Sequence, residues 1–68
     1  MDFNIRKAIL QNLNNATYDD VRSTIDDAIA RNDEVVLPGL GVLFELLYQS
    51  SSQDDKQRMI DQLVKQLN

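Results

Sequence analysis

Apolar residues recur along this chain at intervals of three and four positions, the period of an amphipathic helix. The stretch from about Phe3 to Leu13 carries one such stripe, and Asp2 stands where an N-cap residue is expected. Thr17 and Asp20 then have the spacing of a capping box, which predicts a second helix that begins after Thr17. The apolar face of this second helix consists of Tyr18, Val21, Ile25, Ala28 and Ile29.

The last part of the chain repeats this arrangement. Ser52 precedes Asp55 by three positions, and Lys65 stands in the last turn, where a cation suits the negative end of the helix dipole. The stripe of this helix consists of Met59, Ile60, Leu63, Val64 and Leu67. Residues 12–17 and 48–55 are rich in Asn and Ser, which favour connections because their side chains compete for backbone hydrogen bonds.

The densest apolar run, LPGLGVLFELLYQ at residues 37–49, also holds both glycines and the only proline. A hairpin turning at Pro38-Gly39 is one interpretation, but the run lacks period-two alternation and a lone hairpin is marginal in water. A helix fits better, because Pro38 is tolerated in a first turn and the spacing is helical at Leu40, Leu43, Phe44 and Leu47. We expect Leu37 and the residues before it to be extended, since proline disfavours a helical residue ahead of it.

This third helix is apolar on nearly all sides, and only a narrow strip of Gly41, Glu45 and Gln49 is polar. A helix of this kind must be covered by other elements. The sequence therefore predicts an all-α fold, a compact four-helix small domain over residues 1–68 with a central apolar third helix. Its flank residues Val42, Leu46 and Tyr48 are the candidate interaction surface, and the expected occupant is a second chain in a homo-oligomer.

Composition limits the chemistry that such a domain can perform. The 68 residues include no Cys and no His, which excludes disulfides, thiolate metal sites and Ser-His or Cys-His catalysis. The pattern Gly39-Leu-Gly41 lacks the Lys and Ser/Thr of a phosphate-binding loop. Paired aspartates do not have calcium-loop spacing, and they suit helix N-termini and ion pairs with nearby arginines. We expect no enzyme activity, no cofactor and no metal.

The charge balance argues against a nucleic-acid partner. Eleven acids and seven bases give a net charge of −4, and the bases are scattered among acids, whereas binding of duplex DNA needs clustered Lys and Arg. No apolar segment approaches the roughly 20 residues that span a bilayer, and the first ten residues do not have a signal-peptide pattern. The expectation is a soluble, cytoplasmic protein without a membrane partner.

Three segments resemble the type I minor small acid-soluble spore proteins: MDFNIRKAI at the start, TIDDAI at residues 24–29 and LPGLGVLFE at residues 37–45. Gln49, Lys56, Met59 and Leu63 agree further. The resemblance implies production during sporulation in an endospore-forming bacterium and residence in the spore core, but no established molecular activity. We expect a non-catalytic packing or interaction module, and its spore-core protein partner is unknown.

A looser similarity offers an alternative function. Residues 21–46 resemble the helix-then-strand passage of histone-like HU/IHF proteins, which would make the chain a nucleoid-associated DNA-binding protein. A local cluster such as Arg6, Lys7 and Arg58 would then hold the DNA. The missing basic arms and the acidic charge weigh against this reading. Storage of amino acids for outgrowth is a third possibility, which the sequence does not rank.

Overall fold

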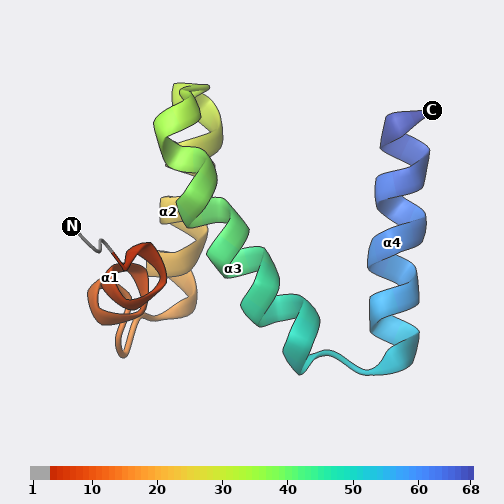
Figure 1. Cartoon of the computed structure of the whole chain (residues 1–68), viewed down its shortest axis with the longest axis horizontal. Coiled ribbons are helices and arrows are strands. Elements are labelled where there is room, and N and C mark those ends of the chain that lie inside the picture. The colour runs from red at the N-terminus through yellow and green to blue at the C-terminus, as the bar shows by residue number, and fades with distance from the viewer. Residues whose placement is uncertain (1–3) are drawn as a thin grey trace.

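The computed structural model describes residues 4–68, which form four α-helices and one short 3₁₀ helix. In chain order these are α1 (Ile5–Asn12), α2 (Tyr18–Arg31), η1 (Glu34–Val36), α3 (Leu37–Ser50) and α4 (Gln53–Leu67). Helix α3 runs through the middle, with α1 and α2 on one side and α4 on the other (Figure 1). The described residues contain no strand, which confirms the all-α class and the central third helix and shows that the hairpin interpretation is wrong.

Helix α2 begins as its sequence predicts. The Asp20 amide donates to Thr17 Oγ1 at 3.2 Å and the Thr17 amide donates to Asp20 Oδ2 at 3.1 Å, which completes the capping box. The helix ends at Asn32, whose backbone is left-handed with φ 50° and ψ 43°. Asparagine tolerates this conformation better than most residues, so it can end the helix where glycine is the commoner choice.

Within the described residues, helix α1 begins at Ile5. Its N-cap is Asn4, whose Oδ1 accepts from the Lys7 amide at 2.9 Å. The predicted cap, Asp2, and the predicted first helical residue, Phe3, lie outside the described residues. After α1 the chain passes through a second left-handed asparagine, Asn15 with φ 63°, which turns it towards α2.

The start of α3 corrects the expectation of an extended lead-in. Residues Glu34–Val36 form η1, and Leu37 has helical angles of φ −60° and ψ −43° although proline follows it. Asp33 caps this turn through its Oδ1, which accepts from the Val35 amide at 3.1 Å, and the Leu37 amide donates to the Glu34 carbonyl. These hydrogen bonds carry the chain directly from η1 into α3 and offset the local preference of a residue that precedes proline.

The core forms where α1 crosses α3. Val42 is 7% exposed and is the one buried hydrophobic side chain within residues 4–68. On the neighbouring turn, a Cβ atom placed on Gly39 would lie 3.3 Å from Ile9 Cδ1, so the absence of a side chain lets α1 approach α3 closely. Ala8 and Ile9 of α1 are half-buried beside this contact, as is the C-cap residue Leu13.

Helix α4 does not wrap around α3 as the others do. Only Ser51 and Ser52 separate the two helices, and both are extended. Ser51 Oγ donates to the Leu47 carbonyl at 2.6 Å, while Ser52 Oγ accepts from the Asp55 amide at 3.2 Å, which is one half of the predicted capping arrangement. The joint directs α4 away from α3 (Figure 1), and residues 61–68 are exposed throughout.

Candidate interaction surface

The polar side chains of this chain act mainly on their own helices. Asp20 and Asp55 lie at helix N-termini, and Arg22 pairs with Asp26 across one turn at 3.7 Å. Asp27 and Arg31 are also four positions apart, but they do not form a salt bridge within residues 4–68. In the same range, no three His, Cys, Asp or Glu side chains come close enough to hold a metal ion. The candidate functional features of this chain are therefore its exposed surfaces.

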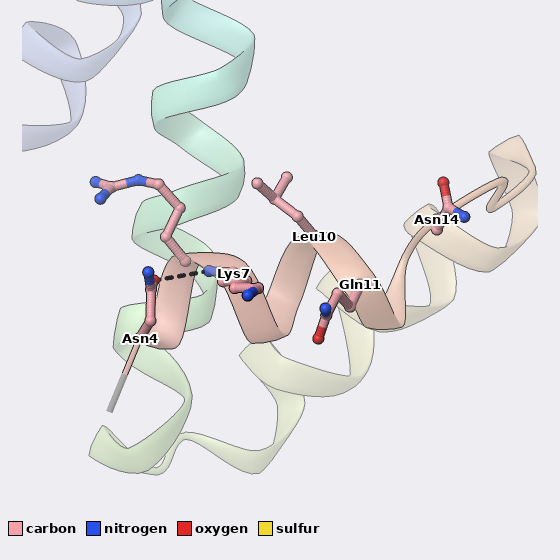
Figure 2. Close-up of a pocket in the computed structure, with 6 residues that line it drawn as sticks. Asn4, Lys7, Leu10, Gln11 and Asn14 are labelled. Atoms are coloured by element: carbon pink, nitrogen blue, oxygen red, sulfur yellow. Dashed lines mark hydrogen bonds between the residues drawn. The ribbon is translucent and has the colours of Figure 1, made fainter. Parts of the chain in front are cut away.

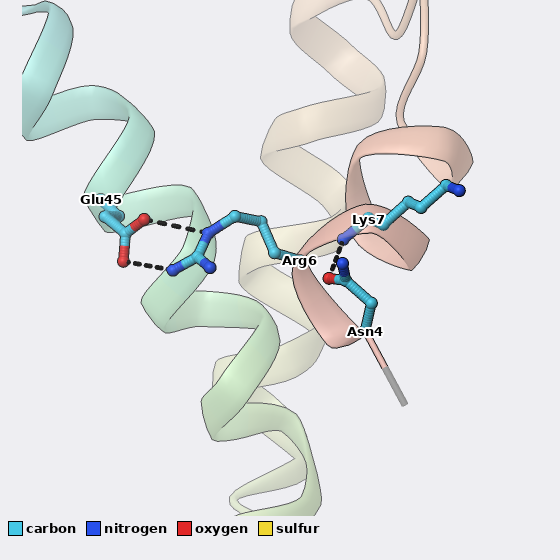
Figure 3. A network of polar contacts seen from close by, with 4 residues as sticks. All are labelled: Asn4, Arg6, Lys7 and Glu45. Carbon is cyan, nitrogen blue, oxygen red and sulfur yellow. Dashed lines mark hydrogen bonds and ion pairs between the residues drawn. The ribbon is translucent and has the colours of Figure 1, made fainter. Parts of the chain in front are cut away.

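One ion pair joins helices that are distant in sequence. Arg6 of α1 donates through Nε and Nη2 to the two carboxylate oxygens of Glu45 on α3, at 3.1 and 2.8 Å (Figure 3). This two-pronged geometry favours one orientation of α1 on α3. Both side chains remain about half exposed, so the pair contributes only about 0.2–1 kcal/mol. No local pattern indicates this pair, because 39 positions separate the two residues.

The predicted interaction residues do not share one surface. Val42 is buried against the chain's own helices, so it is not available to a partner, which corrects its assignment to an open flank. Leu46 is 39% exposed. Tyr48 is half-buried, because the Phe44 ring lies 5.8 Å from it and Lys56 Nζ lies 5.2 Å from its centroid. Helix α1 covers the side of α3 that carries Val42. As a result, Phe44 and Leu47, which belong to the helical spacing expected to face the core, are exposed.

The exposed apolar surface belongs mainly to α3 and α4. On α3 the large exposed side chains are Leu37, Phe44, Leu46 and Leu47. On α4 they are Ile60, Leu63, Val64 and Leu67, which is nearly the whole stripe predicted for that helix. An uncovered stripe of this length is typical of a helix that binds another helix. The sequence contains the stripe, but its exposure follows only from the direction that α4 takes.

Two hollows lie on the α1 side of the molecule. A groove of about 780 Å³ runs between α1, α2 and the start of α3, and its lining includes Ile5, Leu13, Val35 and Leu40. A second hollow, of about 590 Å³, follows the outer face of α1 (Figure 2). Its labelled residues, among them Lys7, Gln11 and Asn14, extend along α1 and into the connection that follows it, and they do not converge on a point. The groove is also lined by Thr24, Asp27 and Arg31, but Thr24 Oγ1 donates to the Asp20 carbonyl at 2.8 Å and no salt bridge of residues 4–68 joins Asp27 to Arg31. A binding role therefore suits the two hollows better than catalysis.

The basic residues considered for DNA are also dispersed. Arg6 is engaged by Glu45, and Arg58 lies 3.9 Å from Asp55 on its own helix. Helices α1 and α4, which carry the three candidate bases Arg6, Lys7 and Arg58, lie on opposite sides of α3 (Figure 1). The strand that the histone-like similarity requires is likewise absent from the described part of the chain. No helix of residues 4–68 combines the length and the apolar character needed to cross a membrane.

Comparison with known proteins supplies the biological setting. The family model described as "Small, acid-soluble spore protein I" matches residues 3–67. A protein of that name from Geobacillus sp. (strain WCH70) is 48% identical over 69 residues, which cover 97% of each chain. Proteins of the same name from Bacillus cereus (strain AH187) and Bacillus anthracis (strain A0248) are 43% identical, over 93% of this chain and 91% of theirs.

No solved structure gives a significant match to the chain. The sequence matches nevertheless extend over nearly its whole length, through all four helices. They agree with the resemblance of the LPGLGVLFE segment, which forms most of α3. The chain therefore belongs to the small, acid-soluble spore protein I family and is a sporulation-associated protein of the spore.

Proposed function

We propose that this chain acts in the spore core as a non-catalytic interaction module that associates with a second copy of itself. The observation that carries the proposal is the uncovered apolar surface of α3 and α4. In a solitary chain this surface would face water, at a cost of about 25 cal/mol per Å². When a partner chain covers this apolar surface, that free energy favours the association.

The small size of the chain favours the same conclusion. Domains of this length commonly need a disulfide, a metal or a partner subunit to supplement a small core. The sequence has no cysteine, and Val42 is the one buried hydrophobic side chain in the described range. A second copy of the same chain is always present where this protein is made, so association with itself enlarges the core without any other component.

Analytical ultracentrifugation from low to high micromolar concentration tests the association. We expect the unmodified chain to form dimers and Leu63→Glu, which places a charge in the α4 stripe, to remain monomeric. Ser23→Glu adds the same group to an exposed position of α2 and should dimerise normally. An unmodified chain that stays monomeric at high micromolar concentration would contradict the proposal.

Two further measurements address the setting. Fluorescence microscopy of a tagged chain in sporulating cells should give signal inside the forespore, and signal confined to the mother cell would refute a spore-core location. Gel shifts at low salt should give no retardation of duplex DNA by excess protein, because the bases are dispersed. Strong retardation would instead support the DNA-binding alternative.

A further inference from the structure

One face of α3 is left open towards α4. Leu37, Gly41, Phe44 and Tyr48 follow one another at intervals of four, three and four, so they share this face. Leu37 is 58% exposed and Phe44 is 43% exposed. The turn at Ser51 and Ser52 leads α4 away from these residues, and the two helices diverge from it (Figure 1). The face lacks a covering helix along most of its length.

Gly41 lies in the middle of this open face and has no explanation within the chain. A Cβ atom placed there would meet nothing within 4 Å, whereas one placed on Gly39 would lie 3.3 Å from Ile9 Cδ1. Glycine in a helix interior costs about 0.5–1 kcal/mol relative to alanine. The close approach of α1 accounts for Gly39. At Gly41 the missing side chain leaves a notch between Leu37 and Phe44 that would admit a helix from outside.

Helix α4 has the surface that would fill this notch. Its apolar stripe is exposed along Ile60, Leu63, Val64 and Leu67. Gln57 borders the stripe on one side, and Asp55, Gln62 and Gln66 lie on the other. Lys56 precedes Ile60 by four positions, so it lies in line with the stripe at the α3 end, over the Tyr48 ring. The charges Asp54, Arg58, Asp61 and Lys65 recur at intervals of four, three and four and share the opposite face. The part of the stripe from Ile60 to Leu67 is itself uncharged, so it can meet the apolar face of α3 in another copy without burying an acid.

The lengths and areas agree with a dimer. Helices α3 and α4 have 14 and 15 residues, which makes them about 21 and 22 Å long, so either can cover the other from end to end. A compact monomer of this mass exposes about 4,400 Å², and this chain exposes 5969 Å². The excess in two chains together is on the order of 3,000 Å², which falls within the range buried by obligate homodimers.

The radius of gyration leads to the same conclusion. It is 13.4 Å, while a globular chain of this length has about 11 Å. The chain is thus more open than a self-sufficient domain. Only Ser51 and Ser52 join the two helices, and their hydroxyls bond within α3 and within α4 respectively, so this short connection restrains where the chain's own α4 can lie. The α4 of another copy is not subject to that restraint.

We infer that the α3 face centred on Gly41 receives helix α4 of a second copy, and that the two copies exchange these helices reciprocally across a two-fold axis. Each chain carries both the receiving face and the inserted helix, so one such pair closes and does not grow into a filament. The inference rests on the proposed self-association and specifies which surfaces meet. Gly41 is then the position where the partner helix comes nearest to the α3 backbone.

Cysteine cross-linking tests the pairing directly, because the natural sequence has no cysteine. Chains carrying Gly41→Cys are mixed with chains carrying Leu63→Cys and oxidised. We expect the mixed dimer to form faster than either like-with-like dimer. Ser23→Cys on α2 is the control and should not cross-link with either partner. A chain that carries both Gly41→Cys and Leu63→Cys reports whether α4 closes onto its own α3.

The outcomes separate the two proposals. Dimers in the ultracentrifuge that cross-link only between two Leu63→Cys chains would keep self-association and overturn the reciprocal exchange. A monomer whose doubly substituted chain cross-links within itself would overturn both. Sedimentation of Gly41→Leu is a second test, and its dimer dissociation constant should rise by about tenfold while its helical content is unchanged. Ser23→Leu, at an exposed position of α2, should leave that constant unchanged.

Discussion

Replacing Val42 by alanine tests how much of the stability depends on the contact between α1 and α3. The side chain is 7% exposed, so the change removes two carbon atoms from the buried centre of the fold. At about 0.8 kcal/mol per buried methylene, with an added term for the cavity, the expected loss is about 1.5–2.5 kcal/mol. For a domain of this size, 1 kcal/mol lowers the thermal midpoint by about 4–8 °C. The midpoint should therefore fall by about 6–20 °C.

Circular dichroism at low micromolar concentration, where association is weakest, measures this loss by heat and by urea. Val35→Ala is the matched control, because it deletes the same atoms from a side chain that is 70% exposed on η1. We expect it to change stability by no more than about 0.5 kcal/mol. Equal losses for the two variants would refute the reasoning that Val42 alone is buried. They would mean that the groove beside η1 contributes as much to the core as the crossing of α1 and α3.

Three local features give further predictions. Thr17→Ala removes the capping hydroxyl of α2 and should lower the unfolding free energy in urea by about 1 kcal/mol, while an unchanged value would mean that the cap is dispensable. Asn32→Ala should cost about 1 kcal/mol because alanine resists the left-handed backbone there, whereas Asn32→Gly should be neutral or stabilising. A double-mutant cycle on Arg6 and Glu45 should give a coupling of about 0.2–1 kcal/mol that falls with added salt, and a coupling that salt does not change would contradict an exposed ion pair.

The proposed self-association predicts that the stability of this protein depends on its concentration. A protein that completes its core by pairing with a copy of itself is more stable when it is concentrated, because association shifts the folding equilibrium by mass action. Variants of Val42 should then be rescued in part by raising the protein concentration. Variants at Leu63 should not, since they remove the surface through which a second copy stabilises the first.

The order of the helices and the starts of α2 and α4 could be read from the sequence because local chemistry sets them. The capping box of Thr17 and Asp20, the cap at Ser52 and the helical spacing after Pro38 all act within one or two turns. The same local reasoning failed at Leu37, where a preference of one residue yielded to the hydrogen bonds of the neighbouring turn.

The division of α3 into a buried side and an open side depends on the tertiary structure. The helix is apolar nearly all round, so its sequence alone does not say which side α1 will cover. The close contact at Gly39 and the long-range pair of Arg6 with Glu45 decide this, and they place Val42 inside and Phe44 outside. The contact at Gly39 and the ion pair each join residues that come together only when the chain has folded.

The sequence by itself thus determined four helices, an apolar third helix and membership of a spore-protein family, because periodicity, caps and the LPGLGVLFE segment are local or directly comparable properties. Only the tertiary structure decided that α1 takes one side of α3 while α4 turns away and leaves its own stripe exposed. The physical reason is that helix formation is governed by neighbours three and four positions apart, whereas burial is governed by the direction in which each connection sends the next helix.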